Sequence, residues 1–238
     1  MQKRVVGIDI VRGWALLLMM IYHILYYIDF LHIAHIELRK DTLWIAFHLL
    51  ILILFISLVG VSLKLTHSTK INWQKVKKRA ILLGASSALI TAISYIIFPH
   101  AWVYFGILHF IFVASILALP FLNHPYIAIS VAIFIFIGSA THFLNTHWLF
   151  QILQQPLHLP TRRTMDLVRF FPWFGVVLIG VALVGFGLHQ KIFNYRFFTA
   201  KNGFNRVLMK MGQHSLLIYL IHQPILFGLC ILIKKILY

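Results

Sequence analysis

The sequence predicts an all-α fold, a polytopic transmembrane helical bundle with about seven spanning helices. Of the 238 residues, 61% are hydrophobic and only 11% are charged, and the mean hydropathy is +0.90. Soluble domains carry about 25% charged residues, so this chain has too little polar surface to cover itself in water. The composition therefore excludes a soluble enzyme and a disordered protein.

Seven apolar segments are long enough to be spanning helices, each of which needs about 20 residues. They cover residues 8–30, 43–63, 80–98, 103–122, 126–144, 168–188 and 211–236. We interpret the first as a retained helix, because no small-residue cleavage site of a signal peptide follows it. Neither end carries a soluble domain, so we expect a single transmembrane domain over residues 1–238.

The basic residues are distributed unevenly along this map. There are 21 Lys and Arg against 5 Asp and Glu, a formal net charge of +16. The N-terminus with Arg12, residues 64–79 and residues 189–210 together hold 14 of the 21, all on one side of seven spans. The positive-inside rule then places the N-terminus in the cytoplasm and the C-terminus outside. Topology and contact with anionic lipids explain most of the excess, which argues against a nucleic-acid partner.

Cysteine and histidine spacing gives no indication of a metal site. The single cysteine, Cys230, lies inside an apolar segment, so neither a disulfide nor a cysteine-based metal site forms within one chain. Zinc usually takes three or four ligands, often from a pair of residues three or four apart on one helix. His32 and His35 have this spacing, but in a loop. We therefore expect no metal.

The first predicted helix carries the densest set of ionisable residues at membrane depth. Asp9, Arg12 and His23 lie on one stripe of it, with Arg12 and His23 about 20° apart around the helix and about 16 Å apart along it. Such groups are costly in a bilayer and often functional. Asp9 and Arg12 also fit a simple ion pair that anchors the helix end. His23 fits either a core histidine bonded to a neighbouring helix or a general base.

Further histidines fall inside the predicted spans. His48 and His109 lie near the outer starts of the second and fourth spans, and His222 near the middle of the seventh. Together with His23 they indicate a polar chamber that opens outward. Histidine suits general base chemistry because its usual pKa is about 6.5, and it also suits a proton relay. A transporter would more often show broken helices in matching halves, whereas proline here lies mostly at helix ends, with Pro224 as the exception.

Several motifs in order resemble one family of membrane enzymes. Residues 8–15, with Asp9, Arg12 and Gly13 in a D-x-x-R-G pattern, resemble the opening of the heparan-α-glucosaminide N-acetyltransferase catalytic-domain family. The more distant acyltransferase-3 family opens with an arginine, ten residues and a histidine, a spacing that Arg12 and His23 match. Further similar segments are 105–111, Asp166 with 171–175, and 214–224, so that the resemblance covers nearly the whole chain.

The resemblance implies an acyltransferase of the bacterial inner membrane. Such proteins take acetyl-CoA from the cytosol and pass the acetyl group to an amine or hydroxyl on the far side, here of an envelope glycan or glycolipid. Basic cytoplasmic loops would hold the CoA phosphates. Larger relatives have more spans, which leaves open whether the acceptor site is complete in one subunit or needs a homodimer.

The resemblance also implies roles for individual residues. His23 is the expected catalytic base or nucleophile. His35 is the second choice, because the lysosomal branch places its histidine in the loop before the second helix. Asp166 would orient a histidine or the acceptor, or simply place a charge at a helix N-terminus. The residues expected to contact acetyl-CoA are Asp9, Arg12, His109 and His222.

Two functions of other classes remain open from the sequence. A non-enzymatic solute or lipid permease could use the same histidine-lined core. A structural subunit of an envelope assembly would have no need of His23, so that replacing it would leave function intact. Transfer or hydrolysis of acetyl-CoA by the purified protein separates the enzyme from both.

Overall fold

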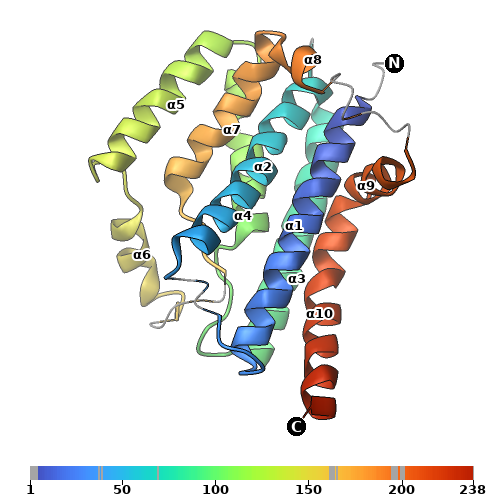
Figure 1. Cartoon of the computed structure of the whole chain (residues 1–238). Helices are drawn as coiled ribbons and strands as arrows, with labels where there is room; N and C mark the ends of the chain where they lie inside the picture. Colours follow the sequence, from blue (N-terminus) through green and yellow to red (C-terminus); the bar gives the residue numbers. More distant parts are fainter. Residues whose placement is uncertain are drawn as a thin grey trace. The chain divides into compact units, whose positions relative to one another are not determined.

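The computed structural model is built of helices throughout the residues it describes, which are 5–36, 38, 40–68, 70–160, 164, 166–193, 198 and 202–237. No strand occurs among them, and Figure 1 shows the helices in chain order. The chain divides into two compact units. The first unit comprises residues 1–55 and 189–238, and the second comprises residues 56–188. We describe each unit separately.

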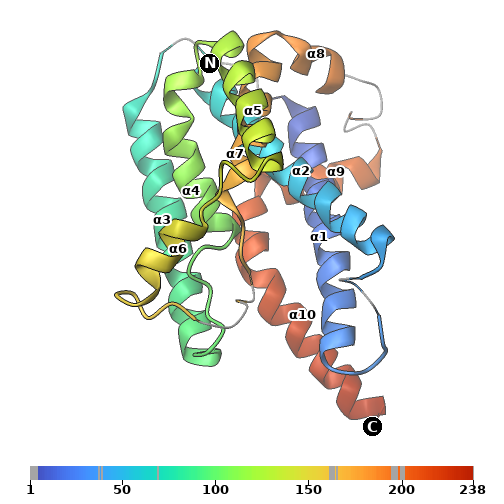
Figure 2. The same cartoon turned by 90° about the vertical axis from the view of Figure 1, so that its left-hand side faces the viewer.

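The first unit is organised around its first and last helices. It contains α1 (Val6–Phe30), the N-terminal part of α2 (Thr42–Thr66), α8 (Leu188–Phe193) apart from its first residue, α9 (Gly203–Gln213) and α10 (Ser215–Leu237). Helices α1 and α10 lie side by side and run in the same direction (Figures 1 and 2). Tyr27 of α1 packs on Phe227 of α10, with ring centroids 5.3 Å apart. Residues distant in sequence thus meet along the whole length of α1.

Helix α9 crosses α1 with almost no space between the two backbones. A Cβ atom added to Gly212 would overlap the carbonyl oxygen of Asp9, and one added to Gly13 would overlap the carbonyl oxygen of Leu208. The same helix turns Leu208 inward and leaves Phe204 half exposed. Small residues at such crossings allow helices to approach closely, so the two glycines fix α9 against the N-terminal half of α1.

The second unit packs its helices in pairs. It contains the rest of α2, α3 (Trp73–Ile97), α4 (Ile107–Leu117), the short 3₁₀ helix η1 (Leu119–Phe121), α5 (Pro125–Ala140), α6 (His147–Gln154) and α7 (Phe170–Gly185). Helix α5 lies beside α7 (Figure 1), and α3 lies beside α4 (Figure 2). Gly60 of α2 and Gly180 of α7 form a reciprocal close contact, because each faces a backbone carbonyl of the other helix, of Val177 and Ser57 respectively.

The predicted membrane bundle is confirmed, with differences in length. Helices α1, α2, α3 and α10 are long and apolar enough to cross a membrane, and α4, α5 and α7 are shorter apolar helices. Each of the seven predicted segments overlaps one of these helices.

Several helix boundaries differ from the predicted ones, by up to seven residues. Helix α3 begins at Trp73, seven residues earlier than predicted, because the Asn72 side chain accepts a hydrogen bond from the Lys75 N–H and caps it, so the basic residues belong to the helix. The fourth predicted span, 103–122, is helical only over Ile107–Leu117 and η1.

Candidate functional site

The imidazoles of His23 and His222 lie together between α1 and α10 in the first unit. Their ring centroids are 5.0 Å apart and their planes are nearly perpendicular, at 83°. The His222 side chain is buried, with 3% of its surface exposed, and His23 is half-buried. Two of the predicted histidines thus form one site, although 199 positions separate them in the sequence.

Hydrogen bonds to the backbone fix which ring nitrogen carries the proton in each neutral ring. Nδ1 of His23 lies 2.8 Å from the Met19 carbonyl oxygen, and Nδ1 of His222 lies 2.6 Å from that of Tyr219. A carbonyl oxygen only accepts hydrogen bonds, so both Nδ1 atoms donate. Both Nε2 atoms are therefore lone-pair acceptors.

The two Nε2 atoms differ in their partners. The side-chain amide of Gln223 donates to His23 Nε2 over 3.3 Å. Nε2 of His222 is buried and has no hydrogen-bond partner among the residues that the structure describes. Buried polar atoms are nearly always hydrogen-bonded, and an exception calls for an explanation. At this site the Gln223 amide therefore occupies His23 Nε2, whereas His222 Nε2 can accept a hydrogen bond from a further donor.

Aromatic side chains surround this histidine pair. His48, from the part of α2 in the first unit, stacks on Tyr22 of α1 with ring centroids 5.0 Å apart. Tyr22 also contacts His23 edge-on, with ring centroids 6.2 Å apart, and the ring centroids of Tyr219 and His222 are 5.4 Å apart. His48 is thus connected to His23 through Tyr22 within this unit, and the outward-opening polar chamber stays a prediction.

The Asp9–Arg12 ion pair lies toward the other end of α1. Arg12 Nη1 donates to Asp9 Oδ1 over 3.2 Å and to the Gly212 carbonyl oxygen over 3.3 Å. Asp9 is only 3% exposed. A buried carboxylate is costly unless it is paired, and the Arg12 guanidinium supplies the opposite charge. The spacing of three predicts this pair, but the contact with the last turn of α9 could not be predicted from it.

Asp166 and His109 belong to the second unit, where they hold the start of α4. Oδ2 of Asp166 accepts the Ile107 N–H over 3.0 Å, which caps the helix N-terminus from a segment 59 residues away. Burial raises the pKa of this carboxyl group, and the hydrogen bond from Ile107 partly opposes that shift. The sequence predicts Asp166 near the beginning of the helix that follows it, whereas its carboxyl group caps α4 instead.

Both ring nitrogens of His109 are engaged within the same unit. The Thr91 hydroxyl donates to the Val103 carbonyl oxygen over 2.8 Å, so it accepts from His109 Nε2, 3.0 Å away. Nδ1 of His109 then accepts the Gly106 N–H over 3.3 Å. These bonds connect α3 and α4, and they leave no ring nitrogen of His109 without a partner.

His35, the second candidate for the catalytic role, lies in the loop that follows α1. Its side chain is 83% exposed, and Nδ1 lies 3.7 Å from Asp29 Oδ1. The same Asp29 oxygen accepts the Ile36 N–H over 3.0 Å and so orders the loop backbone. The proposed roles of His35, Asp166, His109 and the Asp9–Arg12 pair in catalysis or in contact with acetyl-CoA stay predictions.

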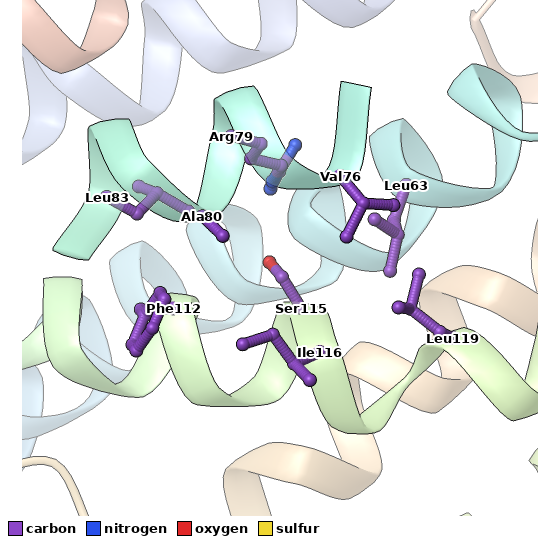
Figure 3. A pocket seen from close by; sticks show the side chains of 9 residues that line it. All are labelled: Leu63, Val76, Arg79, Ala80, Leu83, Phe112, Ser115, Ile116 and Leu119. Atoms are coloured by element: carbon purple, nitrogen blue, oxygen red, sulfur yellow. The ribbon is translucent and has the colours of Figure 1, made fainter. Parts of the chain in front are cut away.

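A small cavity lies between α3 and α4 in the second unit. Figure 3 shows the Ser115 side chain extending from α4 toward α3, among Arg79 and mainly apolar side chains. The Ser115 hydroxyl is buried without a hydrogen-bond partner in the described part of the chain. The space is about 10 Å³, which is close to the minimum for one water molecule. It is far too small for an acyl donor.

No group of three or more His, Cys, Asp or Glu side chains arranged to hold a metal ion occurs in the described ranges. The residue that sequence reasoning did not single out is Gln223. It follows His222 directly and lies in the same motif, residues 214–224, but only the pairing of α1 with α10 shows that its amide reaches His23.

The chain matches a known protein family over most of its length. The model of the family described as heparan-alpha-glucosaminide N-acetyltransferase, catalytic, matches residues 4–224. No match was found among curated proteins or among solved structures. The matched range includes all of the candidate residues named above.

Proposed function

Because the chain belongs to the heparan-α-glucosaminide N-acetyltransferase catalytic family, we propose that it moves an acetyl group from cytosolic acetyl-CoA to an amine or hydroxyl of an envelope sugar across the inner membrane. The family consists of membrane acetyltransferases that use acetyl-CoA. The proposal adds the acceptor class and the direction of transfer.

The observation that carries the proposal is the pair of imidazoles in contact between α1 and α10. His23 has its Nδ1 proton fixed on the Met19 carbonyl, so that Nε2 is available as a base once the acceptor displaces the Gln223 amide. In the transfer, the acceptor atom bonds to the thioester carbonyl carbon and its proton goes to His23. The carbon–sulfur bond breaks, and the leaving thiolate takes a proton from the protonated site, so that CoA leaves as the thiol and the imidazole is again neutral. Positioned base catalysis of this kind contributes typically about 10²–10⁴-fold to rate.

Arg12 supports a donor site near the N-terminal end of α1. Its guanidinium is held by Asp9 and by the Gly212 carbonyl oxygen. The backbone position of Arg12 lies about 16 Å along the helix from that of His23. The basic residues of the predicted cytoplasmic loops attract the CoA phosphates. In this arrangement the pantetheine arm extends along α1 from the basic side toward the imidazole pair.

The direction of α1 and α10 supports the proposed orientation. The two helices run the same way within the first unit (Figure 1). Parallel first and last spans require an odd number of crossings in all, which puts the N- and C-termini on opposite sides. The excess of basic residues on the N-terminal side then favours a cytoplasmic N-terminus.

The test is a thermal-unfolding titration of the detergent-purified protein with acetyl-CoA, with ATP as an anionic control. A ligand that binds only the folded state adds about 2.7 kcal/mol at 100 times its Kd. We expect a rise in the unfolding midpoint with acetyl-CoA and none with ATP. Equal rises would indicate only a phosphate-binding basic surface, and no rise from a folded sample would favour a permease. Either result would contradict the proposal.

A further inference from the structure

We propose that His222 is a second catalytic residue of this site, one that takes a proton from an amine acceptor and returns it to the leaving CoA thiolate. The proposal rests on the acetyl transfer proposed above and concerns an acceptor that carries a primary amine. It starts from the one buried imidazole nitrogen of the pair that has no partner in the described residues, Nε2 of His222.

The geometry leaves this atom no role in holding the fold. His222 donates from Nδ1 to the Tyr219 carbonyl oxygen, a bond within its own helix. That bond fixes the ring and turns the Nε2 lone pair away from the α10 backbone. His109 in the second unit, in contrast, uses both of its ring nitrogens to hold the fold. An acceptor that is buried and unused is instead suited to a donor that arrives with a ligand.

One base does not suffice for an amine acceptor. A primary amine is an ammonium ion at any pH below its own pKa, as a lysine side chain is below about 10.4, and in that form it has no lone pair with which to attack. It must lose one proton before the attack and a second as the amide forms. His23 Nε2 can take only one of these, and the adjacent His222 Nε2 provides the second acceptor.

The steps balance with the two imidazoles in succession. The ammonium gives a proton to His222, and the free amine bonds to the thioester carbonyl carbon. The carbon–sulfur bond breaks, and the thiolate takes the proton from His222, which yields CoA thiol. The remaining proton on the new amide nitrogen goes to His23 and then to water. The products are the N-acetyl acceptor, CoA thiol and one proton.

This order keeps a single positive charge on the pair at any time. The ring centroids are only 5.0 Å apart, and two positive charges at such a distance repel each other strongly in a poorly solvated site. The titratable groups near His222 are His23 of α1, with Tyr22 and His48 behind it, and Tyr219 of α10. None of these side chains is a carboxylate, so none of them carries a negative charge that would retain the proton on His222.

The experiment measures CoA thiol release from acetyl-CoA with glucosamine as the acceptor probe, at pH 6 and at pH 9. This amino sugar is mostly an ammonium ion at pH 6 and mostly a free amine at pH 9. We expect His222→Gln to lower kcat/KM relative to wild type by about 100-fold at pH 6 and by only a few-fold at pH 9, where the first proton is already absent. His23→Gln should be impaired equally at both pH values.

The exposed loop histidine His124 provides the matched control, since His124→Gln should equal wild type throughout. A loss in His222→Gln that is the same at both pH values would indicate a structural role and overturn the proposal, as would activity within twofold of wild type at pH 6. If the wild-type protein itself releases no thiol and shows no unfolding shift with acetyl-CoA, the proposed acetyl transfer fails instead, and this inference falls with it.

Discussion

The His222 imidazole meets the His23 imidazole edge-on, with 5.0 Å between the ring centroids. Each ring donates its Nδ1 proton to a carbonyl of its own helix, so the orientation of both rings depends on backbone that is already helical. The contact between the two rings, in contrast, depends entirely on the pairing of α1 with α10. The site is therefore as stable as that pairing, and the residues that bring α9 and α10 against α1 determine its geometry.

Replacing either glycine of the α1–α9 contact should destabilise the first unit. In Gly212→Ala and Gly13→Ala the new methyl group would overlap a backbone carbonyl oxygen, which cannot move like a side chain. Overpacking of this kind typically costs about 1–3 kcal/mol, so we expect a lower thermal unfolding midpoint in detergent for both. Gly228→Ala in α10 is the control, because nothing lies within 4 Å of the added atom, and alanine is the better helix former. A midpoint in Gly212→Ala equal to that of Gly228→Ala would contradict the described packing.

Much of the helical architecture follows from the sequence because hydropathy and length alone locate apolar spans. The Asp9–Arg12 pair is equally predictable, since residues three apart on one helix are neighbours. Lys75 shows the limit of the same method. Lys75 belongs to a run of basic residues, and the sequence therefore predicts a loop there. In the structure the Asn72 side chain caps a helix that begins at Trp73, so Lys75 lies in its first turn.

The candidate site was less accessible to sequence reasoning, because it depends on which helices pair. His23 and His222 are each recognisable as buried polar residues, but their contact requires the first helix to lie beside the last. The amide of Gln223 on His23 depends on the same pairing. Asp166 was recognised as a polar residue before a helix, but its partner, the Ile107 N–H, belongs to a different helix.

The stability of the second unit should fall in acid through His67. This residue follows α2 and is 2% exposed, and its Nδ1 accepts the Asn72 N–H over 3.1 Å. Burial, and then the charges of Lys75 and Arg79, lower the pKa of His67 below its usual value. The unfolded chain therefore binds a proton before the folded one does as the pH drops below about 6.5. Stability that is present above that pH is lost below it.

The His67→Gln variant isolates this contribution, because glutamine does not titrate. We expect the wild-type unfolding midpoint to fall further than that of the variant between pH 8 and pH 5, whatever their difference at pH 8. The exposed His124 provides the comparison, since His124→Gln should retain the full wild-type dependence. Parallel curves for wild type and His67→Gln would show that another group causes the acid sensitivity.

Asp166 should show the opposite dependence on pH. Burial raises the pKa of its carboxyl group, so the folded state holds the proton more tightly than the unfolded state. Stability from this group is complete in acid and is lost as the pH rises through the raised pKa. In Asp166→Asn the amide oxygen can still accept the Ile107 N–H without a charge to bury. We expect the midpoint of Asp166→Asn relative to wild type to increase from pH 4 to pH 8.

The companion variant Asp166→Ala removes the acceptor and leaves the Ile107 N–H without its partner. Loss of a cap typically costs about 1 kcal/mol, so this variant should unfold below wild type at pH 8, where Asp166→Asn should not. The same pair of variants separates structure from chemistry. If Asp166→Asn is folded and stable but transfers no acetyl group, the carboxylate itself is required, as the sequence resemblance implies.

The seven-span map predicts that Ser68 and Gln155 lie on opposite sides of the membrane. Helices α3, α4 and α5 separate the two positions, and three crossings reverse the side. The weakest of the three is α4, whose 11 residues are about 16 Å long against a hydrocarbon core of about 30 Å. Single-cysteine variants at Ser68 and Gln155, in a Cys230→Ala background, can be labelled in intact cells with membrane-impermeant and permeant maleimides. We expect the impermeant reagent to reach position 155 only, and the permeant one to reach both. Labelling of both positions by the impermeant reagent would show an even number of crossings, and α4 would then be a helix that enters the membrane without crossing it.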